Sequence, residues 1–413
     1  MMATKTFRLD NGLRVSFIPK KGYKHTVLTM VVPFGSVHRT FRSTATTDDI
    51  KTPAGLAHFL EHLVFEASGM NTHVLSSGAE ASALTTHDMT IYELACTDSV
   101  QQHLSFLVKG LTNLSFSDAL VEKERQVIQS EIDLFQEDFA TISMQQWTEG
   151  MYGSMHPLSV DIAGTTESVK QIQRQQLEHA YHTFYQPEHM QLLIVGDIEA
   201  SIMIQTLESL GVSKTEHQTS YSICMESAST SKKVSPTVLH LPVPVPFIRW
   251  GYREQNVTFE QMCVAQVTLA TLFGKHTSFV QRGIADEWFA QNFHYDYRQH
   301  LAYGYGTIAG YVFDLETFYD HFEKYIERVR HRGVTQAELV DGKKEVISYF
   351  FQERDVLRRF SLHTAAYQVK GYDFESLIPT VEKIELTQVQ SYVESHMNAK
   401  HTHAVHIFPL EHA

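Results

Sequence analysis

The order of elements along the chain predicts two α+β domains of similar plan, each an antiparallel or mixed sheet flanked by helices. The 413 residues are enough for two or three domains of ordinary size. Each half of the chain runs from strand-like segments through helical segments and back to strands. Between the halves, residues 211–236 are rich in Ser, Thr and Lys and show no clear period, which is typical of a linker. We therefore expect one domain at 1–210 and a second at 237–413.

The first half opens with a hairpin and a central strand. Asp10-Asn11-Gly12 stands between alternating apolar residues, which is a strong hairpin signal. Residues 26–34 are apolar and β-branched, as in a buried strand. A helix should follow near Thr52-Pro53, with Thr52 as its N-cap and an apolar stripe from Leu56 to Val64. The other predicted elements are strands within 81–97, helices at about 100–112, 118–137 and 165–185, and a strand at 191–195.

The second half repeats this succession without a recognisable repeat of residues. A duplication is therefore suggested only by the order of the elements. The predicted elements are a strand near 237–250, a helix near 258–274, strands across 292–313, helices from about 315 to 371, a helix near 386–397 and a strand near 402–408.

Composition and charge exclude several classes of protein. The formal net charge of −13 argues against a nucleic-acid binder, which would need a basic face. The chain has no run of 18 apolar residues and no apolar leader at its start, so neither a membrane span nor a secretory signal is expected. Three widely spaced cysteines predict neither a disulfide framework nor a cysteine zinc site. A cytoplasmic protein is the simplest expectation.

The most informative motif is His58-Phe59-Leu60-Glu61-His62 on the first predicted helix. At 100° per residue, both histidines and Glu61 lie within about one third of the helix circumference. Two imidazoles at i and i+4 can converge on one metal ion, and a carboxylate between them can act on a water at that ion. The alternative is that this polar side of the helix is merely solvated. A catalytic zinc usually takes a third protein ligand, so the motif alone does not complete a site.

The predicted helix at 118–137 offers candidates for the third ligand. We place Glu124 and Glu131 on its apolar stripe, together with Leu120, Val127, Ile128, Leu134 and Phe135. Carboxylates on such a stripe should be partly buried, where they need a metal or a cationic partner. A buried salt bridge to Arg or Lys and a metal site remain equally open at this point.

Taken together, HFLEH at 58–62 and EKERQVIQSEI at 122–132 resemble the pitrilysin-type (M16, inverzincin) zinc metallopeptidases. The likeness covers nearly all of the first half, and the short bacterial members, whose genes often encode a partner of similar size, are the most similar. Further matching segments are DNGLRV near the start, FGS at 34–36, GLAHFLEHLVFE at 55–66, GAEASALTTHDMTIYEL at 78–94, and AGTTESVKQI and HTFYQPEHMQLLIVGDIE within 163–199.

This resemblance implies one zinc ion per chain, held by His58, His62 and Glu131. It implies that Glu61 is the general base and that Glu124 is a catalytic carboxylate that can hydrogen-bond a ligating histidine. Zinc would lower the pKa of its water to about 7 and polarise the peptide carbonyl.

The resemblance also implies where a peptide binds. In the family, the strand after the zinc helix pairs its edge with an extended substrate, which here makes Ser82 and Ala83 the substrate-binding residues. Ser82 stands where the family usually has Asn, so an ordinary strand residue is the alternative at this position.

A second departure concerns the second half of the chain. The family usually carries an Arg and a Tyr there that hold the substrate carbonyl. Our alignment places Phe279 and Asp286 at those positions, and the second half has no HxxEH. We therefore expect a partner subunit of similar length that lacks HxxEH and supplies the Arg and Tyr, with a homodimer as the other option. Each chain would then form half of a clamshell.

The resulting prediction is a zinc-dependent endopeptidase that hydrolyses short unstructured peptides in an enclosed chamber. The alternative is a non-catalytic subunit of such a heterodimer, which binds peptide or supports its partner.

Overall fold

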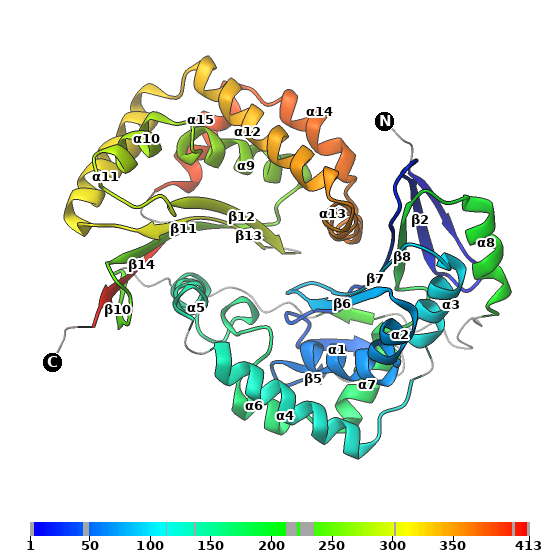
Figure 1. Ribbon diagram of the computed structural model, residues 1–413. Coiled ribbons are helices and arrows are strands. Elements are labelled where there is room, and N and C mark those ends of the chain that lie inside the picture. Colours follow the sequence, from blue (N-terminus) through cyan, green and yellow to red (C-terminus); the bar gives the residue numbers. More distant parts are fainter. Residues whose placement is uncertain are drawn as a thin grey trace. The chain divides into compact units, whose positions relative to one another are not determined.

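The computed structural model describes residues 4–43, 49–112, 114–135, 138–211, 221–223, 235–300, 303–398 and 401–410. The chain forms two compact units, each with its own sheet and helices, which confirms the predicted α+β class (Figure 1). Unit 1 consists of residues 1–135, 160–226 and 353–371, and unit 2 of residues 136–159, 227–352 and 372–413.

Unit 1 contains a mixed six-stranded sheet in the order β1-β2-β8-β3-β7-β6. Only β2 and β8 run parallel, and the other neighbours are antiparallel. The strands are β1 (Lys5–Arg8), β2 (Arg14–Pro19), β3 (Thr26–Val32), β6 (Glu80–Thr85), β7 (Thr90–Cys96) and β8 (Gln191–Gly196). A small second sheet has the order β5-β4-β9, from β4 (Thr40–Ser43), β5 (Ile50–Lys51) and β9 (Tyr221–Ile223).

The helices of unit 1 pack on both faces of its larger sheet. They are α1 (Leu56–Ala67), α2 (Met70–Ser77), α3 (Val100–Gly110), α4 (Asp118–Phe135), α6 (Thr166–Gln171), α7 (Arg174–Phe184), α8 (Ala200–Ser209) and α13 (Leu357–Val369). Leu28 and Met30 of β3 belong to the main core with α1, whereas the hydroxyl of Thr29, between them, hydrogen-bonds Ser361 of α13 at 2.7 Å. Because successive strand residues point to opposite faces, α1 and α13 cover opposite sides of the sheet, and β3 is buried along its whole length (Figure 1).

Unit 2 is built on a five-stranded sheet in the order β10-β14-β11-β13-β12. Its strands are β10 (Thr237–Leu241), β11 (Phe247–Gln255), β12 (His294–His300), β13 (Tyr303–Tyr311) and β14 (Thr402–Pro409). Its helices are α5 (Phe139–Tyr152), α9 (Phe259–Phe273), α10 (Ser278–Ala285), α11 (Leu315–Arg332), α12 (Gln336–Asp355), α14 (Leu377–Glu382) and α15 (Leu386–His396), with short 3-10 turns at Pro157–Ser159 and Phe374–Ser376.

Alternation along β11 shows that this sheet is also covered on both faces. Arg249 hydrogen-bonds Ser143 of α5, whereas Trp250, the next residue, packs edge-on against Phe322 of α11. Unit 2 therefore takes α5 from the first half of the sequence, as unit 1 takes α13 from the second half.

This exchange distinguishes the two units from the consecutive ranges 1–210 and 237–413 expected above. Residues 136–159 pack in unit 2 and residues 353–371 pack in unit 1. The physical reason is burial, since each exchanged segment covers a sheet face that would otherwise leave apolar strand residues in water. Most of the predicted linker at 211–236 lies outside the described residues, but Tyr221–Ile223 within it form β9 and pair with β4.

Several local predictions are confirmed and others are corrected. The hairpin (β1 and β2) and the central strand (β3) form where expected. Thr52 is not the N-cap of α1, because the helix begins after Gly55 and the Thr52 hydroxyl instead donates to the carbonyl of Arg39. The helix predicted at 165–185 is two helices, α6 and α7, because the backbone at Ile172 is extended.

Candidate metal centre

The start of helix α1 is fixed by a glycine in a crowded position. Gly55 has φ +88°, a conformation that glycine adopts without strain. A Cβ at this position would lie 2.4 Å from the carbonyl oxygen of Ala163, in the loop before α6. Ser168 of α6 donates to the carbonyl of Ala54 at 2.9 Å, which holds the same two segments together. The sequence Ala54-Gly55 therefore sets where α1 begins and how it is oriented.

Helix α1 separates apolar and polar side chains as the sequence predicts. Its apolar stripe is buried in the core of unit 1, with Phe59, Leu60, Leu63 and Val64 completely covered. The imidazoles of His58 and His62 lie one turn apart on the other side, with ring centroids 4.7 Å apart. Both are only partly exposed, so this side of the helix is covered rather than freely solvated.

Helix α4 supplies two carboxylates to the same place. Arg125 anchors α4, because its guanidinium donates to the carbonyls of Val169 and Ile172 and lies over the ring of Phe59. Glu124 is buried and Glu131 is about one third exposed.

The buried stripe of α4 differs from the predicted one in its apolar members. It consists of Val121, Glu124, Ile128 and Ile132, whereas Val127 and Leu134 are exposed. The prediction is confirmed for Ile128, and Leu120 packs partly buried against the core, but the prediction is wrong for Val127 and Leu134. The side chain of Phe135 lies outside the described residues. The prediction nevertheless located Glu124 correctly on the covered face.

The three residues predicted as metal ligands converge. One nitrogen of His58, one of His62 and one carboxylate oxygen of Glu131 all lie within 4.8 Å of one another. Glu131 Oε2 is 3.4 Å from Nε2 of His62 and 3.9 Å from Nε2 of His58. Among the residues that the structure describes, this is the only group of three or more His, Cys, Asp or Glu side chains placed to share a cation.

The donor set fits zinc. A tetrahedral zinc ion with ligand distances of about 2.1 Å has its donor atoms about 3.4 Å apart, close to the separations found here. Nδ1 of His62 lies 3.3 Å from Glu124 Oε2, and because a carboxylate can only accept, Nδ1 is the donor. Nε2 of His62 then faces the Glu131 carboxylate at 3.4 Å, an arrangement that a shared cation would stabilise.

Electrostatics around the cluster agree with metal ligation. Burial and, to a smaller extent, the neighbouring His62 together lower the pKa of His58 to about 4, so His58 is neutral near pH 7 and its lone pair is available. The other carboxylate oxygen of Glu124, Oε1, lies 3.5 Å from Nζ of Lys123, and this ion pair helps to orient the carboxylate. Lys123 also pairs with Glu66 at 2.6 Å, so the lysine is itself tied to α1.

Glu61 stands next to this cluster and is held by a residue that the motif search missed. The hydroxyl of Thr85, at the end of β6, donates to Glu61 Oε2 at 2.6 Å, and both residues are buried. Burial raises the pKa of Glu61, while hydrogen bonding from Thr85 opposes the rise. The sequence offered only a weak signal for Thr85, which is a threonine two residues beyond Ala83 and therefore on the same strand face.

Ser82 and Ala83 lie on β6, an edge strand of the six-stranded sheet. Their side chains point to opposite faces, and Ala83 packs against the core that contains α1. Ser82 instead accepts a hydrogen bond from Arg358 at 3.0 Å. The Ser82 side chain is therefore directed away from α1, whereas the side chains of Ala83 and Thr85 face it.

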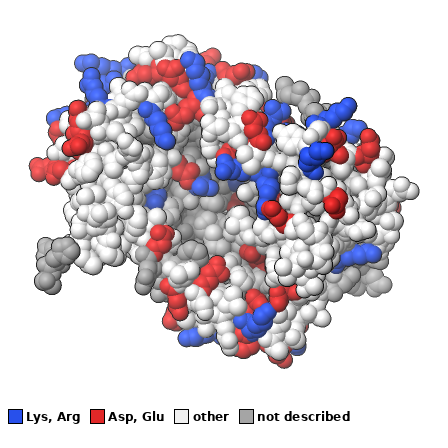
Figure 2. Space-filling view, in the orientation of Figure 1, with Lys and Arg blue, Asp and Glu red and all other residues white. Residues whose placement is uncertain are grey.

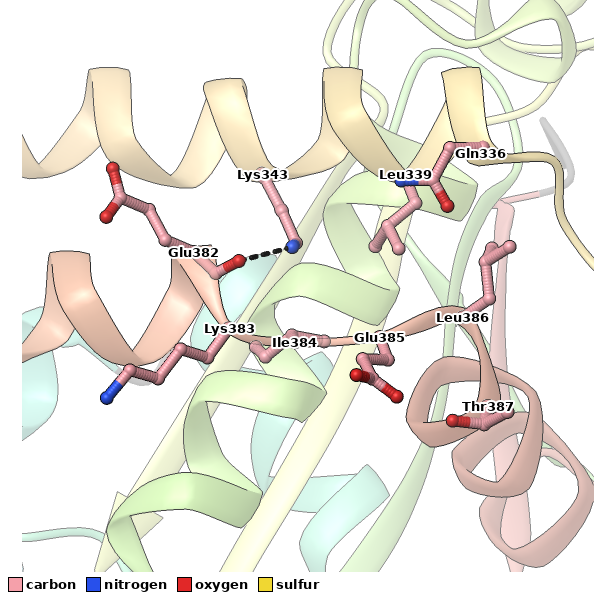
Figure 3. Close-up of a pocket in the computed structure, with 9 residues that line it drawn as sticks. All are labelled: Gln336, Leu339, Lys343, Glu382, Lys383, Ile384, Glu385, Leu386 and Thr387. Atoms are coloured by element: carbon pink, nitrogen blue, oxygen red, sulfur yellow. Dashed lines mark hydrogen bonds between the residues drawn. The ribbon is translucent and has the colours of Figure 1, made fainter.

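Other surface features lack comparable chemistry. A pocket in unit 2 lies between α12 and residues 382–387, where Lys343 donates to the carbonyl of Glu382 at 2.8 Å, and its lining contains no histidine or cysteine (Figure 3). Acidic and basic side chains are intermixed over the face shown in Figure 2. Cys96 and Cys263 are buried free thiols, and Cys224 lies outside the described residues.

Comparison with known proteins identifies the family. The model described as insulinase (peptidase family M16) matches residues 44–166, which include the two histidines, Glu61 and both carboxylates of α4. The model described as peptidase M16 inactive domain matches residues 171–346. The chain belongs to peptidase family M16.

The similarity to individual M16 proteins extends over nearly the whole chain. A Bacillus subtilis (strain 168) protein with the name zinc protease YmfH is 25% identical over 407 residues, which is 95% of this chain and 93% of YmfH. The crystal structure of an M16-like peptidase from Alicyclobacillus acidocaldarius superposes with a TM-score of 0.93 at 26% identity, over 99% of this chain and 98% of that one.

A longer relative shows the same fold in one part of its chain. The periplasmic protease PqqL from Escherichia coli matches 98% of this chain with a TM-score of 0.75 at 17% identity, but the match covers only 47% of the PqqL chain. This chain therefore corresponds to about half of PqqL. Within the described residues of this chain, no helix is both long enough and apolar enough to cross a membrane.

Proposed function

We propose that this chain is a zinc-dependent endopeptidase of family M16 that hydrolyses short unstructured peptides. The observation that carries the proposal is the convergence of His58, His62 and Glu131 beside the Thr85-bound carboxylate of Glu61. The names of the relatives as zinc proteases support the choice of metal.

In this proposal each residue of the centre has a separate role. His58, His62 and Glu131 hold the zinc, and Glu124 fixes the Nδ1–H tautomer of His62. Bound zinc would supply Lewis-acid chemistry, which polarises a peptide carbonyl and acidifies a water. Glu61 accepts the proton of the attacking water and returns it to the leaving amine.

The peptide is proposed to bind as an additional strand on β6. This strand is the sheet edge nearest to the base, since its last residue donates to Glu61. Backbone pairing at an edge selects extended segments with little dependence on side chains, which favours unstructured peptides as substrates.

A partner subunit is proposed to complete the enzyme and enclose its chamber. The length of PqqL, about twice that of this chain, supports an assembly of two such halves. We expect the partner to be an M16 chain of similar length. It would contribute the Arg and Tyr that the family usually carries at the positions where this chain has Phe279 and Asp286. Light scattering on the purified chain, with and without a candidate partner, would reveal a complex of about twice the chain mass.

The Glu61→Gln variant tests the proposal. It should retain stoichiometric zinc and lose hydrolysis of a fluorogenic peptide, because the amide cannot take the proton of water. Cleavage by the pure variant at the wild-type rate would refute the mechanism. A wild-type chain that holds no zinc would instead favour a non-catalytic peptide-binding or scaffolding subunit.

A further inference from the structure

Strand β6 is held from both of its faces by side chains. On the α1 face, Thr85 binds the Glu61 carboxylate. On the opposite face, Ser82 binds Arg358. Among the strands that the structure describes, β6 is an edge strand with one neighbour, β7, that supports it through the backbone. Its position must therefore depend more on side-chain contacts than that of an interior strand.

The guanidinium of Arg358 contacts two neighbouring strands at once. Its Nε donates to Glu93 of β7 at 2.6 Å, its Nη1 to Glu80 of β6 at 2.7 Å and its Nη2 to Ser82 at 3.0 Å. Ser82 and Glu93 are paired directly across the β6–β7 ladder. One planar group thus bridges the ladder, at the position where the sequence resemblance places substrate binding.

Arg358 is carried by a helix that is itself fixed. It lies in the first turn of α13, whose Ser361 hydrogen-bonds Thr29 at the centre of the sheet. The centre of the Phe360 ring lies 4.2 Å from Nζ of Lys20, the residue that follows β2. The guanidinium therefore reaches β6 from a rigid base rather than from a loop.

The contacts of Arg358 differ in strength. The pair with Glu80 is exposed, and such pairs contribute little. Glu93 is buried, and burial raises the pKa of its carboxyl while Arg358 opposes the rise. The hydrogen bond between Arg358 and Glu93 is therefore the strongest of the three. It fixes the guanidinium in a position from which Nη2 also reaches Ser82.

We propose that Arg358 is a positioning residue for substrate binding, which keeps β6 in place for pairing with the peptide. The inference rests on the function proposed above, since it assumes that an extended peptide pairs with β6. A strand that is already ordered does not lose backbone entropy when the peptide binds. Without Arg358, β6 would be less ordered before the peptide binds, so peptide binding should weaken. Thr85, three residues beyond Ser82, keeps its own hydrogen bond to Glu61, so the chemistry at Glu61 should stay nearly unchanged.

The test compares Arg358→Met with Arg359→Met in the full-length chain, together with its partner if one is needed for activity. Arg359 is the next residue on α13, is largely exposed and pairs with Glu353, so it is a matched control. We expect Arg358→Met to raise KM for a fluorogenic peptide roughly 10-fold. This factor corresponds to the free energy of ordering about one backbone residue when the peptide binds. The kcat should stay within about twofold of wild type. Arg359→Met should change neither constant.

A second variant and a second readout keep the inference falsifiable if Arg358→Met folds poorly. Arg358→Lys retains the charge beside Glu93 but loses the fork, so its KM should rise by a smaller factor, roughly threefold. Hydrogen exchange of the free protein should be faster over residues 80–85 in both Arg358 variants than in wild type and Arg359→Met.

The outcomes separate this inference from the proposed function. Wild-type KM and wild-type exchange over 80–85 in the Arg358 variants would overturn the positioning role and leave the peptidase intact. A fall in kcat without a change in KM would also overturn it. Absence of peptide hydrolysis in the wild type would reject the proposed function, while the exchange of β6 would still show whether Arg358 orders that strand.

Discussion

The hydroxyl of Thr85 provides the most direct test of how the base is oriented. Thr85→Val removes this hydroxyl and keeps the shape of the side chain. Glu61 would then lose the 2.6 Å hydrogen bond donated to its Oε2. A hydrogen bond to a charged group contributes about 1.5–3 kcal/mol. If that energy serves to hold the carboxylate in its reactive orientation, kcat should fall roughly 10- to 150-fold.

The assay measures kcat and KM with a fluorogenic peptide and, in parallel, the zinc content of each protein. The Thr85 hydroxyl hydrogen-bonds Glu61 and lies 3.4 Å from the Thr90 hydroxyl, and neither residue is a proposed ligand, so zinc should stay stoichiometric and KM should change little. Thr85→Ser is the matched control, because it restores the donor, and its kcat should remain close to that of wild type. A valine variant with wild-type kcat would refute the reasoning, as would a serine variant as impaired as the valine one.

Three further predictions concern the metal, the fold and pH. Glu124→Gln should weaken zinc binding roughly 10-fold in a chelator competition, since the tautomer of the ligating histidine is less firmly held, whereas Glu122→Gln on the exposed side of α4 should not. Gly55→Ala should destabilise the chain by about 2 kcal/mol or more in urea unfolding, because its φ is +88° and the added Cβ has no room, whereas Gly69→Ala, with φ +74° and open space, should cost only about 1 kcal/mol. Burial lowers the pKa of His38 to about 4, so between about pH 6.5 and pH 4 the unfolded chain binds a proton that the folded chain does not, and stability falls as the pH falls. The stability advantage of wild type over His38→Asn should therefore shrink by about 3 kcal/mol from pH 7.5 to pH 4, and a difference that does not vary with pH would contradict this account.

The convergence of the candidate ligands could be predicted because the sequence information behind it is local. His58, Glu61 and His62 lie on one helix, and helical geometry alone places them on one side. Glu131 is on another helix, but its spacing of seven residues from Glu124 restricts both carboxylates to one side of that helix. The structure brings all of these side chains together.

Contacts between distant segments could not be predicted in this way. Thr85 is not part of a recognisable motif, and its role depends on how β6 packs against α1. Arg358 is separated from Ser82 by 276 residues and lies in a stretch that was expected to belong to the second domain. The exchange of α5 and α13 between the units follows from covering both faces of each sheet, a requirement that local periodicity does not reveal.

The buried face of a helix rich in charged residues can also be mispredicted by a single position. On α4 the predicted stripe contained Ile128, which is buried, but also Val127 and Leu134, which are exposed, and it left out the buried Val121 and Ile132. Because α4 is rich in charge, several stripes fit its sequence almost equally well. The packing of Arg125 against α6 and Phe59 decides which one is buried.

X-ray diffraction at the zinc absorption edge, on crystals of the chain grown with zinc, tests the central claim most directly. We expect one anomalous peak per chain, bonded to Nε2 of His58, Nε2 of His62 and a carboxylate oxygen of Glu131. Zinc bound elsewhere, or bound without Glu131, would contradict the account.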